Sequence, residues 1–206
     1  MKDDRELVLE RVQSALAASP HRSPAPDRPA PPAAEASGRG DVGERFVKMV
    51  QENGCASVRV ENLNEAPAAA AAYLRERDLP QQAAIVESKI TALPWTGAGI
   101  KAIENPSKDE PVTITGAIAA IAETGQIALA AASQESLASL LARTHIVLIE
   151  ETAICPSLDN LAEIIDRQPS GIILIAGPSR TADIEQTIVL GAHGPQAMLV
   201  IVAGGD

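Results

Sequence analysis

The sequence predicts an α/β fold, an open mixed or parallel sheet with helices on both faces, preceded by an N-terminal helical arm. Segments of strand length alternate with segments of helix length along most of the chain. Several strand-length segments are apolar almost throughout, which is typical of strands buried on both faces of a sheet. The chain has 37 alanines but one Trp, one Tyr and one Phe. Small side chains let helices approach a sheet closely, in agreement with this fold class.

The chain is predicted to have three parts. Residues 1–19 contain an amphipathic helix over Asp3–Ala18, and residues 20–40 hold six of the 15 prolines and form an extended linker. Residues 41–206 form the α/β domain. The helical arm is expected to dock on its own domain, on a second copy or on a partner. Its apolar stripe at helical spacing consists of Leu7, Val8, Val12, Ala15 and Leu16.

Within residues 41–206, regular elements follow one another closely. Strands are predicted over Ser57–Val60, Ala83–Val86, Val112–Thr115, Gln126–Ala130, His145–Ile149, Gly171–Ala176 and Ala197–Ala203. Helices are predicted over Asp41–Asn53, Glu65–Asp78, Ala117–Ala122, Gln134–Ala142, Pro156–Arg167 and Thr181–Leu190. The stretch Ile90–Pro111, with its prolines and glycines, is predicted to be irregular. In such sheets ligands bind at the carboxyl ends of strands, which directs attention to the loops after Ala176 and around Glu123.

Charge and cysteine content exclude several functions. The net charge of −10 disfavours nucleic acid and anionic membranes as partners. The two cysteines, Cys55 and Cys155, have no neighbouring ligands for a metal or redox centre, so no cofactor is expected in this chain. Met1–Leu9 lacks the apolar core of a secretory signal, and no apolar run is long enough to span a membrane. We therefore expect a cytoplasmic protein.

The run from Gly177 to Glu185 is the densest candidate for chemistry. It follows a predicted strand and opens a predicted helix, which Ser179 or Thr181 caps, with Asp183 in its first turn. The same junction offers free N–H groups, two hydroxyls and the Arg180 guanidinium, a combination suited to a phosphate or carboxylate. A capped helix and an anion site are both compatible with this run, and the acidic residues weigh against a polyanion.

The turn Gly191–Pro195 is the second candidate. His193 lies between two glycines, in a backbone free to place it as an acid, a base or a ligand. The alternative is that His193 caps the C-terminus of the preceding predicted helix, where a positive charge is favourable.

The turn Ala122–Gly125 is the third candidate. Apolar segments flank Glu123 on both sides, which favours partial burial and a raised pKa of its carboxyl group. Such a carboxylate serves as a general base or a nucleophile, whereas a lone carboxylate in a turn is otherwise solvated. The chain has no Walker loop, GxSxG, HExxH or GxGxxG motif.

Taken together, these runs resemble the LUD-domain family, in its lactate-utilization branch. The matching segments are Gly116–Gly125, Gly177–Glu185 and Gly191–Pro195, and the likeness extends over nearly the whole chain. Ala192 stands where a bulkier, valine-like residue is expected. The resemblance implies a fold similar to that of CoA transferases, glucosamine-phosphate isomerases and ribose-phosphate isomerases.

The resemblance also implies a role beside two companion proteins that oxidise L-lactate to pyruvate, with iron–sulfur clusters on the companions. In that role the chain is a non-redox subunit that binds a small carboxylate or organises the assembly. The alternatives are a stand-alone enzyme or binding protein for a phosphorylated or CoA-linked molecule, and a pure scaffold. The expected catalytic residues are Glu123, Asp183 and His193, and the expected binding residues are Thr124, Gly125, Gly177, Ser179, Arg180, Thr181 and Gly194.

Overall fold

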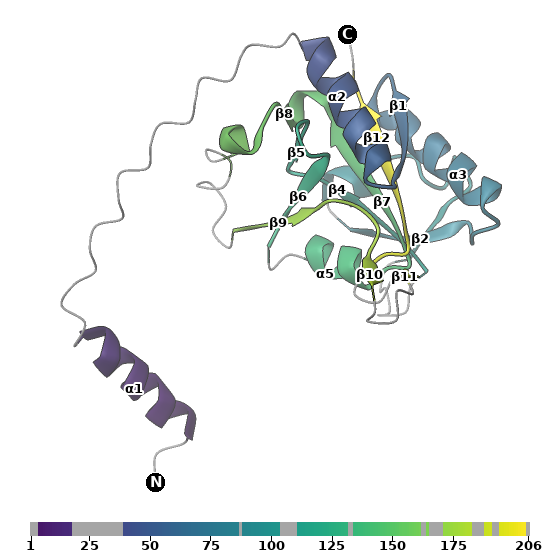
Figure 1. Ribbon diagram of the computed structural model, residues 1–206. Coiled ribbons are helices and arrows are strands. Elements are labelled where there is room, and N and C mark those ends of the chain that lie inside the picture. The colour runs from purple at the N-terminus through teal and green to yellow at the C-terminus, as the bar shows by residue number, and fades with distance from the viewer. Residues whose placement is uncertain are drawn as a thin grey trace. The chain divides into compact units, whose positions relative to one another are not determined.

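The computed structural model describes residues 4–17, 39–86, 88–103, 111–131, 134–161, 164, 171–182, 188–190 and 194–204. The chain divides into two compact units, Met1–Ala33 and Ala34–Asp206. In the first unit, helix α1 (Asp4–Ala17) confirms the predicted N-terminal helix (Figure 1). Within the described ranges, no helix has both the length and the apolar character needed to span a bilayer.

A six-stranded parallel sheet forms the centre of the second unit. Its strand order is β1-β12-β7-β4-β2-β3. β12 and β7 pair in register from Ala197 opposite Thr144 to Ala203 opposite Glu150. The bounds are β1 Ala56–Val60, β2 Gln82–Val86, β3 Lys101–Ile103, β4 Val112–Gly116, β7 Thr144–Glu150 and β12 Ala197–Ala203.

A second sheet of four strands has the order β8-β5-β6-β9. β6 is antiparallel to both β5 and β9, and β8 is parallel to β5. The bounds are β5 Ala119–Ile121, β6 Gln126–Ala130, β8 Ile154–Cys155 and β9 Ile172–Ile175. A separate antiparallel pair joins β10 (Arg180–Ala182) and β11 (Ile188–Leu190).

The helices of this unit connect and cover the strands. Among the residues described, the helices with defined bounds are α2 Arg39–Glu52, α3 Ala66–Glu76, α4 Ser88–Thr91 and α5 Gln134–Leu141, with short 3₁₀ turns at Leu63–Glu65, Glu151–Ala153 and Leu158–Leu161. α2 ends before Gly54, whose φ of +87° suits a glycine at a helix end. α3 has Pro67 in its first turn, where a missing N–H costs no helical hydrogen bond.

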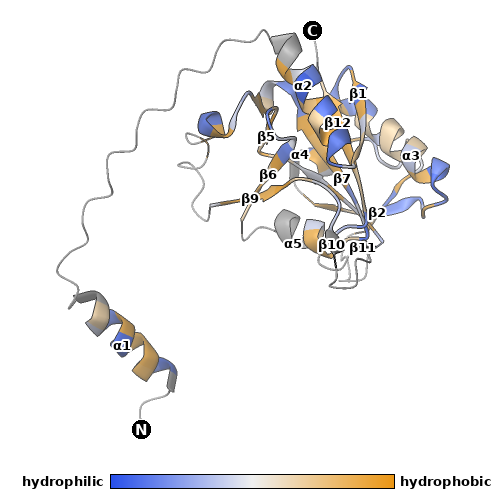
Figure 2. Cartoon of the chain, in the orientation of Figure 1, coloured by the Kyte–Doolittle hydropathy of each residue, from blue (hydrophilic) through white to orange (hydrophobic). Residues whose placement is uncertain are grey.

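The two faces of the central sheet are covered differently. On one face, Ile146, Leu148 and Ile201 pack with the buried side of α3. On the other face, Val147 and Val200 pack with α2 and with strand β6 of the second sheet. Successive side chains of a strand point to opposite faces, so both faces of β7 and β12 must be apolar (Figure 2). The predicted fold class, with helices on both faces, is confirmed.

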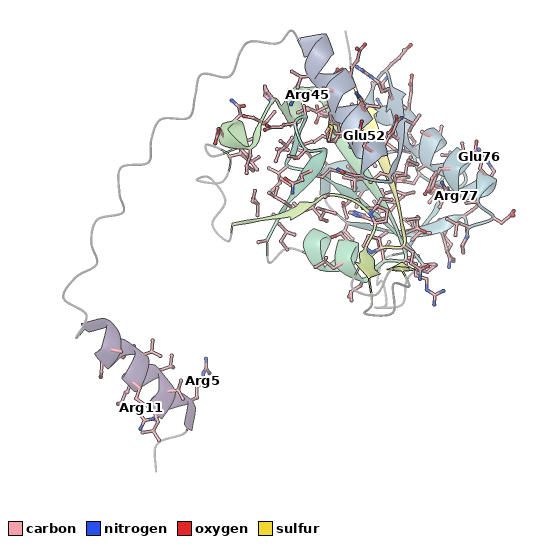
Figure 3. All side chains as sticks on the ribbon, in the orientation of Figure 1. Arg5, Arg11, Arg45, Glu52, Glu76 and Arg77 are labelled. Atoms are coloured by element: carbon pink, nitrogen blue, oxygen red, sulfur yellow. The ribbon has the colours of Figure 1, made fainter. Side chains whose placement is uncertain are left out.

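The only tryptophan of the chain lies on the α3 face. Trp95 is 2% exposed, and its indole N–H donates to the carbonyl oxygen of Ile90 at 2.6 Å. Tyr73 of α3 belongs to the same cluster, and the Arg77 guanidinium lies 4.6 Å from the centre of its ring (Figure 3). The stretch Ile90–Pro111, predicted to be irregular, therefore contains the last two residues of α4, all of β3 and the buried Trp95.

Two predicted helices are wrong. The segment Ala117–Ala122 contains strand β5, in which Ala119, Ala120 and Ile121 are fully buried between two apolar clusters. Pairing with β6 and burial on both sides outweigh the helical preference of alanine. The segment Thr181–Leu190 contains part of β10 and all of β11, in agreement with the β-branched residues at its end. Pro156–Arg167 holds the 3₁₀ turn at Leu158–Leu161, and of the rest of it only Ile164 is described beyond that turn.

His145, on β7, is a fully buried polar residue. Its Nε2 lies 2.8 Å from the hydroxyl oxygen of Thr115 on the neighbouring β4. Among the described residues, its Nδ1 has no hydrogen-bonding partner. Burial penalises the charged imidazolium and lowers the pKa of His145 from 6.5 to about 3.

Acidification is expected to destabilise the protein through His145. Between pH 6.5 and 3 the unfolded chain binds a proton at this imidazole that the folded chain does not bind, so the free energy of unfolding falls as the pH falls. The loss is about 2 kcal/mol at pH 5 relative to pH 7. His145→Gln keeps a polar partner for Thr115 but does not titrate, so urea denaturation should show a smaller loss over this range. Equal losses in both proteins would contradict the prediction.

Candidate functional site

The turn after β5 and the loop after β9 leave the second sheet at the same end. This follows from the pairing, because β6 is antiparallel to both strands. The first holds Glu123, Thr124 and Gly125, and the second begins at Gly177. The topology thus brings together two of the three sequence runs that were singled out for chemistry.

Asn53, at the end of α2, contacts both of these loops. Its Nδ2 donates a hydrogen bond to the backbone carbonyl of Thr124 at 2.8 Å. Its backbone carbonyl faces Gly177, where a Cβ would lie 2.7 Å from the Asn53 oxygen. We call Asn53 and these two loops the motif-loop cluster. Sequence reasoning did not single out Asn53, because a polar residue next to a terminating glycine is an ordinary helix end.

Gly125 and Gly177 are required by this close approach. Gly125 has a φ of +67°, and a Cβ there would lie 2.8 Å from the Met49 carbonyl carbon and 2.9 Å from the Val50 nitrogen. These are main-chain atoms of α2, which cannot move away to make room for a side chain. Absence of a side chain at both positions lets the loops rest directly on the helix backbone.

The third run joins the cluster through Ser179. The backbone N–H of Ser179 donates to the carbonyl oxygen of Pro195 at 2.8 Å. A Cβ on Gly194 would lie 3.4 Å from the Ser179 Cβ, so the two segments are in close contact. Parts of all three predicted runs therefore converge on one region.

Glu123 is exposed, so the expectation of partial burial is wrong. The backbone of the turn is fixed, because the N–H of Glu123 donates to the Pro156 carbonyl at 3.1 Å and that of Gly125 donates to the Ile121 carbonyl at 2.8 Å. The apolar residues on either side pack into the sheets, while the turn itself lies at the sheet end with this side chain in solvent. Thr124 is half-buried, and its hydroxyl lies 3.1 Å from the Gln126 side-chain oxygen.

The helix N-terminus expected after Ser179 does not form. Arg180 and Thr181 belong to β10 and pair with Leu190 and Val189 of β11. The N–H of Ser179 donates to Pro195, so the stretch from Ser179 to Ala182 does not present the free N–H groups of a helix N-terminus that were expected to suit an anion. Asp183 and His193 lie outside the described residues.

These loops follow the carboxyl ends of their own strands, β5 and β9, but lie at the amino edge of the central sheet. Asn53 precedes β1, and Pro195 precedes β12. At the opposite, carboxyl edge, Arg59 of β1 forms an ion pair with Glu151 after β7, with 2.7 Å between Nη2 and Oε1. Gly43 of α2 packs directly against this carboxylate. The candidate loops therefore lie at the carboxyl ends of strands in the second sheet, and not in the central sheet.

Neither cysteine is part of a ligand cluster in the portion of the chain that the structure describes. Cys55 is buried and Cys155 is half-buried, and burial raises the pKa of the Cys155 thiol. No group of three or more His, Cys, Asp or Glu side chains comes together among the described residues.

The sequence profile of the LUD domain matches residues 43–203. The chain belongs to the LUD-domain family. It is 28% identical to the uncharacterized protein YkgG of Escherichia coli (strain K12), over 97% of this chain and 98% of that protein. It is 33% identical to lactate utilization protein C of Bacillus subtilis (strain 168), over 53% of this chain and 50% of that protein. That alignment thus spans about half the length of the relative.

The fold of this LUD-domain protein is shared with a solved structure. A DUF162 family protein from Deinococcus radiodurans superposes with a TM-score of 0.62, over 82% of this chain and 99% of that one, at 24% identity. The matched region of the LUD profile begins at Gly43, which contacts Glu151, and ends with β12. The family match therefore includes the motif-loop cluster, both sheets and α2 from Gly43 onward.

Gly125→Ala is expected to destabilise the protein much more than Gly99→Ala. Both glycines have positive φ, +67° and +89°, but a Cβ on Gly99 would meet nothing within 4 Å. Gly99→Ala should cost about 1–2 kcal/mol from backbone strain alone, whereas Gly125→Ala adds overpacking against α2 for a total of about 2–5 kcal/mol. Urea denaturation measures both. Equal losses in the free energy of unfolding would mean that the Gly125 turn is not packed tightly against α2.

Proposed function

We propose that this LUD-domain protein takes part in lactate utilization, as a non-redox subunit of an assembly that oxidises L-lactate to pyruvate. In this proposal the motif-loop cluster binds the carboxylate of the substrate or product. The relatives named lactate utilization protein C motivate the choice of substrate. The observation that supports the choice of site is the convergence of three separate runs around Asn53 and Ser179.

The residue types at the cluster suit a small 2-hydroxy or 2-oxo acid. Arg180 follows Ser179 directly, and a guanidinium recognises a carboxylate through two parallel, charge-assisted hydrogen bonds. Thr124, Ser179 and Thr181 supply hydroxyls for the remaining oxygens. Glu123 or His193 then accepts the proton of the substrate hydroxyl. The C–H bond at C2 breaks as the C=O bond forms, and its hydrogen leaves as a second proton and two electrons. The two electrons pass to the companion proteins, which the family resemblance implies carry iron–sulfur clusters.

Arg180→Ala is expected to weaken lactate and pyruvate binding by about tenfold or more, because a charge-assisted contact is lost. Titration calorimetry on the folded chain, with its companions present, measures the affinity. Arg45→Ala is the matched control, since Arg45 is an exposed arginine on α2 (Figure 3). Affinity that is equal in the two variants would rule out Arg180 as the carboxylate ligand.

Association with companions is tested separately from ligand binding. Affinity purification from native cells grown on lactate, followed by mass spectrometry, should recover iron–sulfur proteins in a fixed ratio to this chain. Recovery of the chain alone would contradict its role as a subunit, whatever the result of the titration.

The accessible carboxylate of Glu123 favours one second candidate, a stand-alone enzyme that transfers CoA. In such an enzyme the carboxylate attacks an acyl-CoA, and CoA then returns to the glutamyl carbonyl as a thioester while the acid leaves. Incubation with acyl-CoA should then add the mass of CoA less one water at Glu123, and Glu123→Gln should abolish the adduct. Absence of an adduct in the unsubstituted protein would exclude this candidate.

A further inference from the structure

We propose that Asn53 is a positioning residue of the motif-loop cluster. In this proposal it holds the Thr124 turn and the Gly177 loop at one fixed spacing, so that polar groups from both loops face the same ligand. The choice of lactate or pyruvate as the ligand rests on the proposed function. The positioning of the loops rests on the geometry around Asn53.

Two different parts of Asn53 contact the two loops. The side-chain Nδ2 donates to the carbonyl of Thr124 at 2.8 Å, which fixes the turn that carries Glu123. The backbone carbonyl packs against the Cα of Gly177, at the start of the loop that carries Ser179. One residue thus sets the distance between two segments that are remote in sequence.

Asn53 is itself held in place by helix α2. Its N–H donates to the Met49 carbonyl at 2.9 Å, which continues the helical hydrogen bonding of α2. One and two turns earlier, Val50 and Phe46 of α2 are fully buried in the apolar cluster that includes β6 of the second sheet. Asn53 therefore projects from a helix that is anchored to the same core as β6, and it provides a rigid reference for the loops.

Two backbone hydrogen bonds of these loops have other partners. Gly125 donates back to Ile121 in its own turn, and Ser179 donates to Pro195 before β12. Neither bond joins the Thr124 turn to the Gly177 loop. A carboxamide at position 53 is needed because its N–H₂ group donates to a carbonyl, which an alanine side chain does not do.

The test compares Asn53→Ala, Asn53→Gln and Asn64→Ala with the unsubstituted protein. Asn53→Ala removes the donor, Asn53→Gln keeps an amide donor on a longer side chain, and Asn64→Ala makes the same truncation at an exposed asparagine. Hydrogen exchange of the Gly125 and Ser179 amides reports the two loops, amides of β7 and β12 report the core, and titration reports lactate and pyruvate affinity.

We expect Asn53→Ala to speed exchange at Gly125 about tenfold and to weaken lactate or pyruvate binding about tenfold. Exchange at Ser179 should be unchanged, because the backbone carbonyl that packs against Gly177 remains. Exchange in β7 and β12 should be unchanged, Asn53→Gln should recover part of the affinity, and Asn64→Ala should have no effect. Unchanged exchange at Gly125 would overturn the positioning role. A lower melting temperature of Asn53→Ala with unchanged lactate and pyruvate affinity would also overturn it, because Asn53 would then be purely structural.

Failure of the proposed function gives a different result. If the unsubstituted protein binds neither lactate nor pyruvate, the proposed ligand is wrong. Faster exchange at Gly125 in Asn53→Ala would in that case still support the positioning of the Thr124 turn by Asn53. The two hypotheses are therefore separable in one set of samples.

Discussion

The parallel pairing of β7 with β12 is the contact on which the rest of the structure depends. Seven residue pairs join these strands in register, and side chains on both faces are buried. A strand pair that is apolar on both faces is stable only if each face is covered. α3 and the Trp95 segment cover one face, and α2 with the second sheet covers the other. The layered architecture follows from that requirement.

The second sheet connects this core to the motif-loop cluster. Its inward side chains, such as Ile127 and Leu129, pack in the same cluster as Val147 and Val200 of the central strands. Its strand ends then rest against the last turn of α2, where Gly125 and Gly177 present bare backbone. The cluster therefore consists of irregular segments whose positions are set by elements buried in the core. Rigid support of polar loops is what a preorganised binding site requires.

Sequence patterns predicted the central strands well because burial on both faces leaves long apolar runs, as in β7 and β12. The N-terminal helices were predictable for a similar reason, since Phe46 and Val50 recur at helical spacing. β5 was not, because Ala119 and Ala120 have a helical preference that only the pairing with β6 overcomes. The motif residues were found by their pattern, but the exposure of Glu123, the strand at Arg180 and the contacts of Asn53 depend on how distant segments meet. No local pattern contains that information.

The placement of the aromatic residues makes the two faces of the domain optically distinct. Trp95 and Tyr73 both belong to the α3 face, whereas Phe46 is on the face with α2 and the second sheet. Intrinsic fluorescence and near-ultraviolet circular dichroism therefore arise almost entirely from one layer. A spectroscopic transition followed at the tryptophan reports the melting of the α3 layer, and loosening confined to the Thr124 turn leaves that signal unchanged. A fluorophore introduced at an exposed position near that turn gives the second layer a signal of its own.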